Sequence, residues 1–315
     1  MFNYEGLTFK FKVNRALTDK EKEHHLLQNE RLQSKPLYHA RIIRMNSAYL
    51  ECVDKFFGGK GFMSAAAIVV TGILIWFLYF LTDAAITDAN FRNSGYFWYT
   101  YVFIPVLCVL LFIYVKVFLK ECFTYTHFPI RFNRKTRKVH VFRQDGTVMT
   151  EDWDKLYFAL CKCRSDLVWE VRGHRMAVDG ETVLETFALP YADALVRGTN
   201  STTWSFWEYV RRYMEEPDEL PALAGQIKDA PDIADKKESF SEGSDRLMKE
   251  MGVLAILILP ITLIYILGRV LAIQTSKIPR WPEEIEAECA IEPNDPNVRD
   301  AKLIAKPAPE PFKMY

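Results

Sequence analysis

The sequence predicts an α+β membrane protein with a transmembrane helical hairpin, a β-rich soluble domain closed by one helix, and a third transmembrane helix. Three observations predict this class. Two uncharged apolar runs, 61–81 and 96–115, lie close together, and a third covers 251–273. Residues 122–216 instead alternate polar and apolar side chains between turn residues. A helix of about 20 apolar residues spans the hydrocarbon core of a bilayer.

The first two runs are predicted to form a helical hairpin over 61–115. Only residues 82–95 join them, which is too short for a folded domain. Basic residues near span ends favour the cytoplasmic side of a membrane. Residues 41–60 carry four of them, the connecting loop carries one, and 116–138 carries seven. This contrast predicts that both ends of the helical hairpin are cytoplasmic.

Residues 1–60 are predicted to form a cytoplasmic N-terminal region. Thr18 and Glu21 have the spacing of a capping box, which predicts a short helix from that point. We interpret 41–57 as an amphipathic helix that lies on the membrane surface. The glycines in 58–61 then form a flexible corner that leads into the first span.

Residues 122–216 are predicted to form the soluble domain. Period-two alternation predicts seven strands, at 125–133, 138–143, 147–153, 156–164, 167–172, 175–178 and 182–189. Asp145-Gly146 and Asp179-Gly180 are hairpin turns, because glycine readily adopts a positive φ. An amphipathic helix over 202–216 follows, capped by Ser201 or Thr202. This is the layout of a pleckstrin-homology-like barrel with one end plugged by the helix.

The C-terminal part is predicted to contain a linker, a span and a tail. Residues 217–250 are acidic, contain proline and glycine, and predict a flexible linker. The run 251–273 predicts the third transmembrane helix, although Arg269 lies near its end. Three spans place the proline-rich tail, 274–315, outside the cytoplasm. Its six basic and eight acidic residues give a net charge of −2.

No feature of the sequence predicts catalysis. The net charge is zero, with 40 basic and 40 acidic residues, so no overall field attracts nucleic acid. No GxSxG, HExxH or triad-like pattern is present, and His127, His140 and His174 are isolated in the sequence. Cys161 and Cys163 share a strand face, but no second ligand pair completes a metal site. We therefore expect no enzyme, no catalytic or metal-binding residues, and no cofactor.

One basic cluster is the candidate binding site. It surrounds the first predicted hairpin of the soluble domain, directly after a span, where it faces the anionic inner leaflet. Its members are Arg131, Arg134, Lys135, Arg137, Lys138 and Arg143. These residues either contact lipid headgroups or simply fix the topology and solvate a turn.

Two stretches resemble an uncharacterised bacterial inner-membrane family. The first is RMNSAYLECVDKFF at 44–57, which leads into Gly61. The second is PIRFNRKTRKVHVFR at 129–143, with Asp145-Gly146 and the WDK of 153–155 after it. Members pair a membrane hairpin with a pleckstrin-homology-like domain, and they are encoded among type VI secretion and polymorphic-toxin genes. The resemblance covers 44–216, and its motifs concern packing and topology, not chemistry.

The resemblance implies a location and a role, both of which are expectations. The protein would lie in the bacterial inner membrane with a cytoplasmic N-terminus and a periplasmic tail. It would act by protein–protein contact, as an immunity or accessory protein whose partner is a toxin or a secretion component. The alternative is a membrane- or lipid-sensing scaffold that uses the basic hairpin. The identity of the partner and the oligomeric state stay open.

Overall fold

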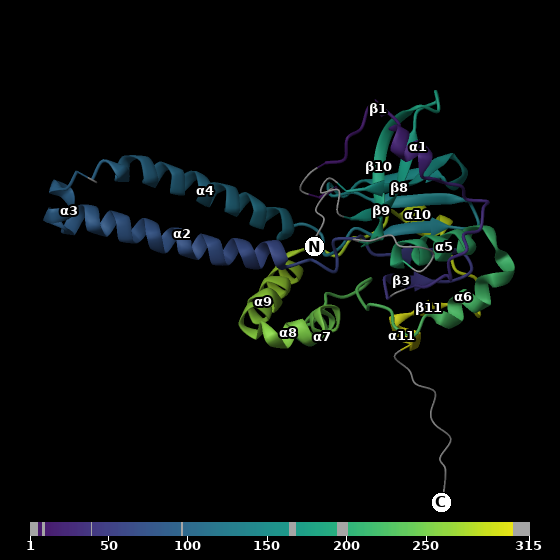
Figure 1. The fold of residues 1–315 in the computed structure, drawn as a ribbon. Helices are drawn as coiled ribbons and strands as arrows, with labels where there is room; N and C mark the ends of the chain where they lie inside the picture. The colour runs from purple at the N-terminus through teal and green to yellow at the C-terminus, as the bar shows by residue number, and fades with distance from the viewer. Residues whose placement is uncertain are drawn as a thin grey trace, which may run out of the picture. The chain divides into compact units, whose positions relative to one another are not determined.

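The computed structural model describes residues 6–7, 10–38, 40–95, 97–163, 168–193 and 201–304 (Figure 1). The chain divides into two compact units. Unit 1 contains 1–57, 127–237 and 278–315, and unit 2 contains 58–126 and 238–277. Unit 2 therefore consists of two inserts in the chain of unit 1. Each insert is preceded and followed in the sequence by a segment of unit 1.

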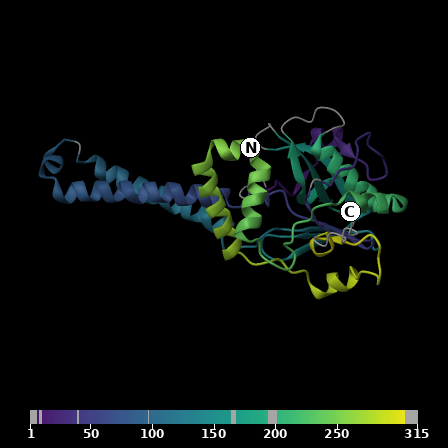
Figure 2. The same cartoon turned by 90° about the horizontal axis from the view of Figure 1, so that it is seen from below.

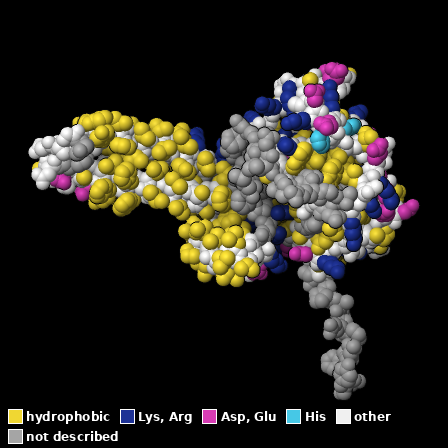
Figure 3. Space-filling model, in the orientation of Figure 1, with side chains coloured by type: hydrophobic (Ala, Val, Ile, Leu, Met, Phe, Trp, Pro, Cys, Tyr) yellow, Lys and Arg dark blue, Asp and Glu magenta, His cyan; other side chains and the backbone are white. Residues whose placement is uncertain are grey.

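The first insert of unit 2 forms the predicted helical hairpin. It contains α2 (Phe62–Thr87), the short α3 (Ala89–Asn93) and α4 (Tyr99–Glu121). Both α2 and α4 are long and apolar enough to cross a membrane. Only 11% of the apolar window of α2 and 6% of that of α4 are buried, so these helices are not the core of a soluble fold. Hydrophobic side chains accordingly cover the surface of the helical hairpin (Figure 3).

A buried carboxylate at the end of α4 is hydrogen-bonded to the start of α2. The Glu121 side chain, at the end of α4, accepts hydrogen bonds from the Gly61 backbone N–H at 2.7 Å and from the Ser64 N–H and hydroxyl, each at 2.6 Å. These donors lie in the first turn of α2, where N–H groups lack helical partners. A negative charge there also interacts favourably with the helix dipole.

The second insert does not form the predicted third span. The run 251–273 is divided among the end of α7 (Phe240–Met251), α8 (Val253–Leu257) and α9 (Leu259–Thr275), with Gly252 at a φ of 57° between the first two. Arg269 is buried, and its Nε donates to Glu238 at 2.6 Å. The run is therefore not one continuous helix, and Leu259–Thr275 is shorter than the two helices that are long and apolar enough to cross a membrane.

Unit 1 contains two antiparallel sheets in a curled arrangement. Sheet 1 has the order β11-β3-β4-β5-β6-β7, and sheet 2 has the order β1-β10-β9-β8-β2. The strands of sheet 1 are β3 (Ile42–Met45), β4 (Tyr49–Cys52), β5 (Ile130–Asn133), β6 (Lys138–Phe142), β7 (Val148–Asp152) and β11 (Arg299–Asp300). Those of sheet 2 are β1 (Arg15–Ala16), β2 (His25–Leu26), β8 (Leu156–Lys162), β9 (Trp169–Met176) and β10 (Thr182–Asp193). The predicted strands at 167–172 and 175–178 are thus one strand, β9.

Helix α5 (Thr202–Glu215) fills the space inside the curled sheets. Ser201 caps it by accepting from the Trp204 N–H at 3.2 Å. Trp207 is fully buried, with its ring 4.7 Å from Phe158 and 5.9 Å from Trp153. The predicted helix is confirmed, and the aromatic rings at this centre join both sheets to the helix.

The remaining helical segments of unit 1 are short. They are α1 (Asp19–Glu23), η1 (Trp153–Lys155), η3 (Pro217–Glu219), α6 (Leu220–Gln226), α10 (Glu283–Glu288) and α11 (Ala301–Ile304). Figure 2 shows α10 and α11 near the C-terminal end of the chain, in yellow. The capping box of Thr18 and Glu21 is confirmed, but α1 ends at Glu23, earlier than expected.

Three further sequence interpretations are wrong because they considered each segment without the distant residues that it contacts. Residues 41–57 contain β3 and β4 instead of a surface helix, since Asn46 Oδ1 accepts from the backbone N–H groups of Ala48 and Tyr49 and so closes a turn. Residues 217–250 contain α6 and α7 where a flexible linker was expected. The tail folds back, since β11 pairs with β3. Residues 305–315 lie outside the described part.

The tail correction also changes the domain to which the tail belongs. Arg299 pairs with Met45 and Asp300 with Arg44, so the described tail belongs to the same sheet as the N-terminal strands. The described part of the tail is therefore a part of the β-rich domain.

Candidate functional site

A row of polar side chains crosses sheet 1 and forms the base of the site. Successive cross-strand partners from β3 to β7 are Arg44, Glu51, Arg131, His140 and Thr150. The neighbouring row on the other face is apolar and contains Met45, Leu50, Phe132 and Val139, which belong to the core. Side chains alternate between the faces of a strand, so the core row fixes the polar row on the outer face.

Arg131 is held rigidly in the middle of this row. Only 1% of its side chain is exposed. Its guanidinium donates to Glu51 at 2.6 and 2.9 Å and lies 3.2 Å from Glu286. The Tyr49 and Trp281 rings lie 4.3 and 4.8 Å from its Cζ atom. Burial alone would lower the pKa of Arg131, but the charges of Glu51 and Glu286 raise it, so the group is always charged.

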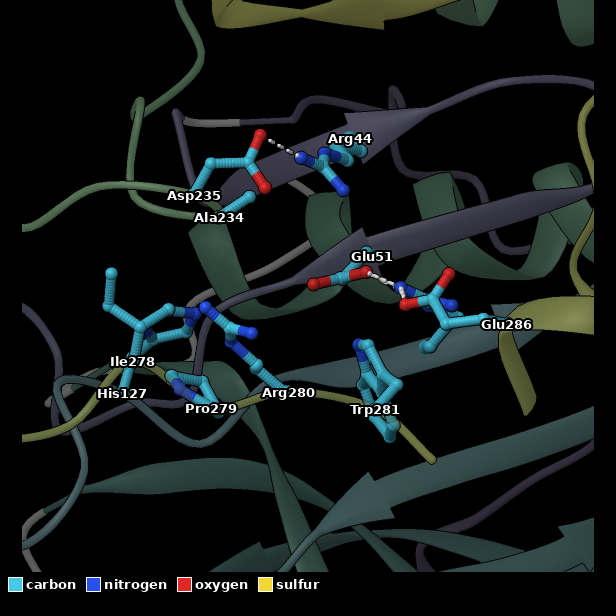
Figure 4. Close-up of a pocket in the computed structure, with 11 residues that line it drawn as sticks. Arg44, Glu51, His127, Ala234, Asp235, Ile278, Pro279, Arg280, Trp281 and Glu286 are labelled. Atoms are coloured by element: carbon cyan, nitrogen blue, oxygen red, sulfur yellow. Dashed lines mark hydrogen bonds and ion pairs between the residues drawn. The ribbon is translucent and has the colours of Figure 1, made fainter. Parts of the chain in front are cut away.

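The polar row borders a cavity of about 460 Å³ (Figure 4). All of its walls belong to unit 1. They are formed by Arg44, Glu51, His127, Arg131, Ala234, Asp235, Ile278, Pro279, Arg280, Trp281 and Glu286. The segment 278–286 covers the outer face of sheet 1, so residues far apart in the sequence meet here. This volume lies in the range of small-molecule sites, roughly 300–1,000 Å³.

The three arginines of the cavity differ in how they are paired. Arg131 is paired with Glu51 and Glu286, and Arg44 donates to Asp235 at 2.7 Å. Arg280 is exposed and makes no hydrogen bond or ion pair with any residue that the structure describes. In Figure 4 its side chain lies between those of His127 and Trp281. One cation of the cavity is thus available to a ligand.

His140, which follows Arg131 in the polar row, is buried and carries no charge at neutral pH. Its side chain is buried, and Nδ1 lies 2.9 Å from the Thr150 hydroxyl. Burial lowers the pKa of His140 to about 4, so the imidazole is neutral at pH 7. This histidine supports the sheet next to the cavity and carries no positive charge toward it.

Most of the predicted basic cluster is paired with acidic residues of unit 1. Lys135 pairs with Glu292 at 2.5 Å, Arg137 with Asp154 and Glu215 at 2.7 and 2.8 Å, Lys138 with Glu288 at 2.7 Å, and Arg143 with Glu185 at 2.6 Å. Arg134 is half-buried and has no acidic partner among the described residues. Burial removes Arg131 from the residues that can reach a lipid headgroup, whereas contact by the other five stays a prediction.

A second buried cluster contains potential metal ligands. Within the described residues, Glu21, Cys161 and His174 lie together: His174 Nε2 is 3.7 Å from Glu21 Oε1 and 4.0 Å from Cys161 Sγ. Arg15, however, donates to both oxygens of Glu21, at 2.6 and 2.7 Å. A guanidinium at this position repels a cation, so we interpret the cluster as a polar layer between α1 and sheet 2.

Protonation in this layer agrees with that interpretation. Burial raises the pKa of the Cys161 thiol to about 12, so the thiolate that binds metal is not formed at pH 7. Burial lowers the pKa of His174 to about 4. Burial alone would raise the pKa of Glu21, but hydrogen bonds from Arg15 and Thr18 lower it to about 2. The approach of Glu21 and His174 to Cys161 was not expected from the sequence.

Only some of the residues that line the cavity could be identified from the sequence. Arg44, Glu51 and Arg131 occupy alternating positions among core residues, which marks them as one face of a sheet once the strands are known. Nothing local indicates that Asp235 and residues 278–286 cover that face. The cavity was therefore missed because it depends on the position of the tail.

The family match spans both units. Residues 107–293 match a family model described as a family of unknown function (DUF6708), and this range covers more than half of the chain. It begins inside α4 and ends beyond α10. No curated protein and no solved structure matches the chain.

Proposed function

We propose that this chain, which belongs to the family of unknown function DUF6708, is a membrane-anchored protein that acts by contact with another protein and not by catalysis. The exposed apolar surface of α2 and α4 is the observation that supports the membrane anchor. Trp76, Tyr79, Tyr101 and Phe112 are each more than 60% exposed. Burial of apolar surface is worth roughly 25 cal/mol per Å². Insertion of the helical hairpin in a bilayer removes this surface from water.

The proposed topology has two crossings and cytoplasmic ends. Tyr49 to Cys52 pair residue by residue with Ile130 to Asn133, so the first insert leaves and re-enters the same sheet. This supports an even number of crossings. The excess of basic residues at 41–60 and 116–138 over the connecting loop supports the cytoplasmic side of a bacterial inner membrane.

Reporter fusions test this topology. Green fluorescent protein at either terminus should fluoresce, because it folds in the cytoplasm. Alkaline phosphatase inserted in the loop at 88–95 should be active, because it folds only outside the cytoplasm. Phosphatase activity after a fusion at residue 315 would contradict the proposal.

For unit 1 we propose a pleckstrin-homology-like fold. Its support is the order of elements: β3 to β7 follow one another in one sheet, β8 to β10 in the other, and α5 packs between them. In this arrangement the helical hairpin is an insertion between the second and third strands of sheet 1 by chain order. The domain would thus be attached to the membrane at two neighbouring strands.

The partner that we propose is a toxin or a secretion component, and the role is immunity or an accessory function. The resemblance of 44–57 and 129–143 to a family encoded among type VI secretion and polymorphic-toxin genes supports this proposal. Deletion of the gene in a cell that keeps an intact neighbouring toxin gene should make the cell sensitive. Expression of the full chain should restore growth. Normal growth of the deletion strain while the toxin is produced would contradict the proposed role.

The second candidate is a lipid-sensing scaffold that uses the turn at 134–137. The half-buried Arg134, which lacks an acidic partner among the described residues, favours it. The full chain can be placed in neutral and in anionic nanodiscs and followed by hydrogen exchange. Stronger protection of 134–137 only in anionic nanodiscs would support lipid contact, and equal protection in both would exclude it.

A further inference from the structure

We propose that the cavity lined by Arg44, Arg131 and Arg280 binds a small ligand through an anionic group, either a carboxylate or a phosphate. The site is independent of the proposed contact with a protein partner. Arg280 is the primary binding residue, and Arg44 is the second. The argument rests on the charges of the cavity, on its shape and on the pairing of each acidic residue.

The charges around the cavity leave one positive charge unmatched. Asp235, at the rim, is shared by two cations, since Arg44 donates to it at 2.7 Å and Lys302 at 2.9 Å. The lining holds three cations, Arg44, Arg131 and Arg280, and three anions, Glu51, Asp235 and Glu286. Because Arg131 pairs with both Glu51 and Glu286, and Arg44 pairs with Asp235, Arg280 is left without an acidic partner, and an anionic group can pair with it.

The pairing of the acidic residues disfavours a cationic ligand. Glu51 lies 2.6 Å from Arg131, and Glu286 lies 3.2 Å from the same guanidinium. Asp235 already accepts from two side chains. A lysine, an arginine or an amine that entered the cavity would have to replace one of these contacts. An anion can instead bind Arg280 without breaking any contact among the described residues.

The walls suit a ligand that is larger than a bare ion. Ile278 and Pro279 contribute apolar surface, and the Trp281 ring lies against Arg131, which fixes its position. Figure 4 shows Trp281 on the same side of the cavity as Glu51 and Glu286, with His127 on the other side of Arg280. A flat or aliphatic body can rest on these groups while the anionic end contacts the guanidinium.

The anion can be part of a soluble molecule or of a lipid headgroup, and the experiment separates these sources. The full chain is placed in neutral phosphatidylcholine nanodiscs and titrated with inorganic phosphate and then with succinate. Trp281 fluorescence reports binding. The Trp281→Phe variant gives the fluorescence of the other six tryptophans, which is subtracted. A second series compares the same signal in nanodiscs that contain phosphatidylglycerol.

Two arginine variants identify the site. Arg280→Gln should weaken binding by roughly tenfold or more, the usual effect of losing a hydrogen bond to a charged group. Arg299→Gln is the matched control, because Arg299 has no acidic partner that the structure describes, donates to backbone carbonyls and does not line the cavity. It should leave the affinity unchanged.

Each outcome decides the proposal. Saturable binding of phosphate or succinate that Arg280→Gln alone weakens supports a soluble ligand. A Trp281 signal that appears only with phosphatidylglycerol and depends on Arg280 supports a headgroup. Equal weakening by Arg280→Gln and Arg299→Gln indicates diffuse attraction and overturns the proposal. A Trp281 signal that never depends on Arg280 overturns it as well.

Discussion

Replacement of Arg131 by methionine should destabilise unit 1 strongly. Glu51 is 4% exposed, and it would lose the two hydrogen bonds that it accepts from Arg131. Glu286 is half-exposed and would remain solvated, so it adds little. The main cost is therefore one uncompensated buried carboxylate.

The expected loss is about 3–5 kcal/mol, the usual cost of breaking a buried ion pair by removing one partner. Contacts of the guanidinium with the Tyr49 and Trp281 rings are lost as well, but methionine can pack between the same rings. For a domain of about 200 residues, each kcal/mol lowers Tm by roughly 2–4 °C. The variant should therefore melt on the order of 10 °C lower.

Thermal unfolding of the full chain in detergent, followed by circular dichroism, measures this shift. The control is Arg137→Met, whose guanidinium is 38% exposed and pairs with Asp154 and Glu215. It should cost less than about 1 kcal/mol, since exposed pairs contribute little. The double variant Arg131→Met/Glu51→Leu should recover at least half of the loss because no buried charge is left. An equal loss in the single and double variants would refute the reasoning.

Three further predictions concern other parts of the chain. Gly61→Ala should prevent stable folding of unit 2, because Gly61 has a φ of 96° and a Cβ there would lie 2.2 Å from the Arg269 Cα. The control Gly72→Ala should be neutral, because a Cβ at that position has no atom within 4 Å. The yield of protein extracted in detergent compares the two variants. Trp207→Ala should cost about 3–5 kcal/mol because this side chain is fully buried, whereas Trp76→Ala, which is 65% exposed on α2, should not lower the Tm of unit 1. Burial lowers the pKa values of His140 and His174 to about 4. Between about pH 6.5 and 4 only the unfolded chain binds protons at these two histidines, so the free energy of unfolding should be highest above about pH 6.5 and fall as the pH decreases to 4. The double variant His140→Gln/His174→Gln should show a flatter pH dependence of Tm, and an unchanged slope would contradict this assignment.

Much of the fold could be predicted where the signal is local. The spacing of Thr18 and Glu21 predicted a capping box, and Gly146 and Gly180 have the positive φ values expected at their turns. The amphipathic pattern of 202–216 predicted α5, in which Trp207, Val210 and Met214 are buried. These features depend on neighbours within a few residues, so they can be identified without knowledge of the tertiary structure.

The errors arose where distant segments decide the structure. Ile42 and Leu50 are core residues of a sheet because β5 lies beside β4, although 77 residues separate Cys52 from Ile130. Arg269 was interpreted as a charge that flanks a span, but it bonds Glu238 and the backbone carbonyls of Gly58 and Lys60 inside unit 2. The cavity was missed for the same reason, since Arg280 and Trp281 come from the folded tail.

The division of unit 1 by two inserts has a consequence for the order of biosynthesis. His25 pairs with Ala159 and Arg15 with Val183, so the N-terminal strands are synthesised long before their partners. Synthesis proceeds at about 5–20 residues per second. The apolar helices 62–87 and 99–121 emerge in this interval, before β5 exists. Strands β1 and β2 must therefore wait unpaired until the helical hairpin has been made, and sheet 1 is completed only when β11 joins it, after all of its other strands.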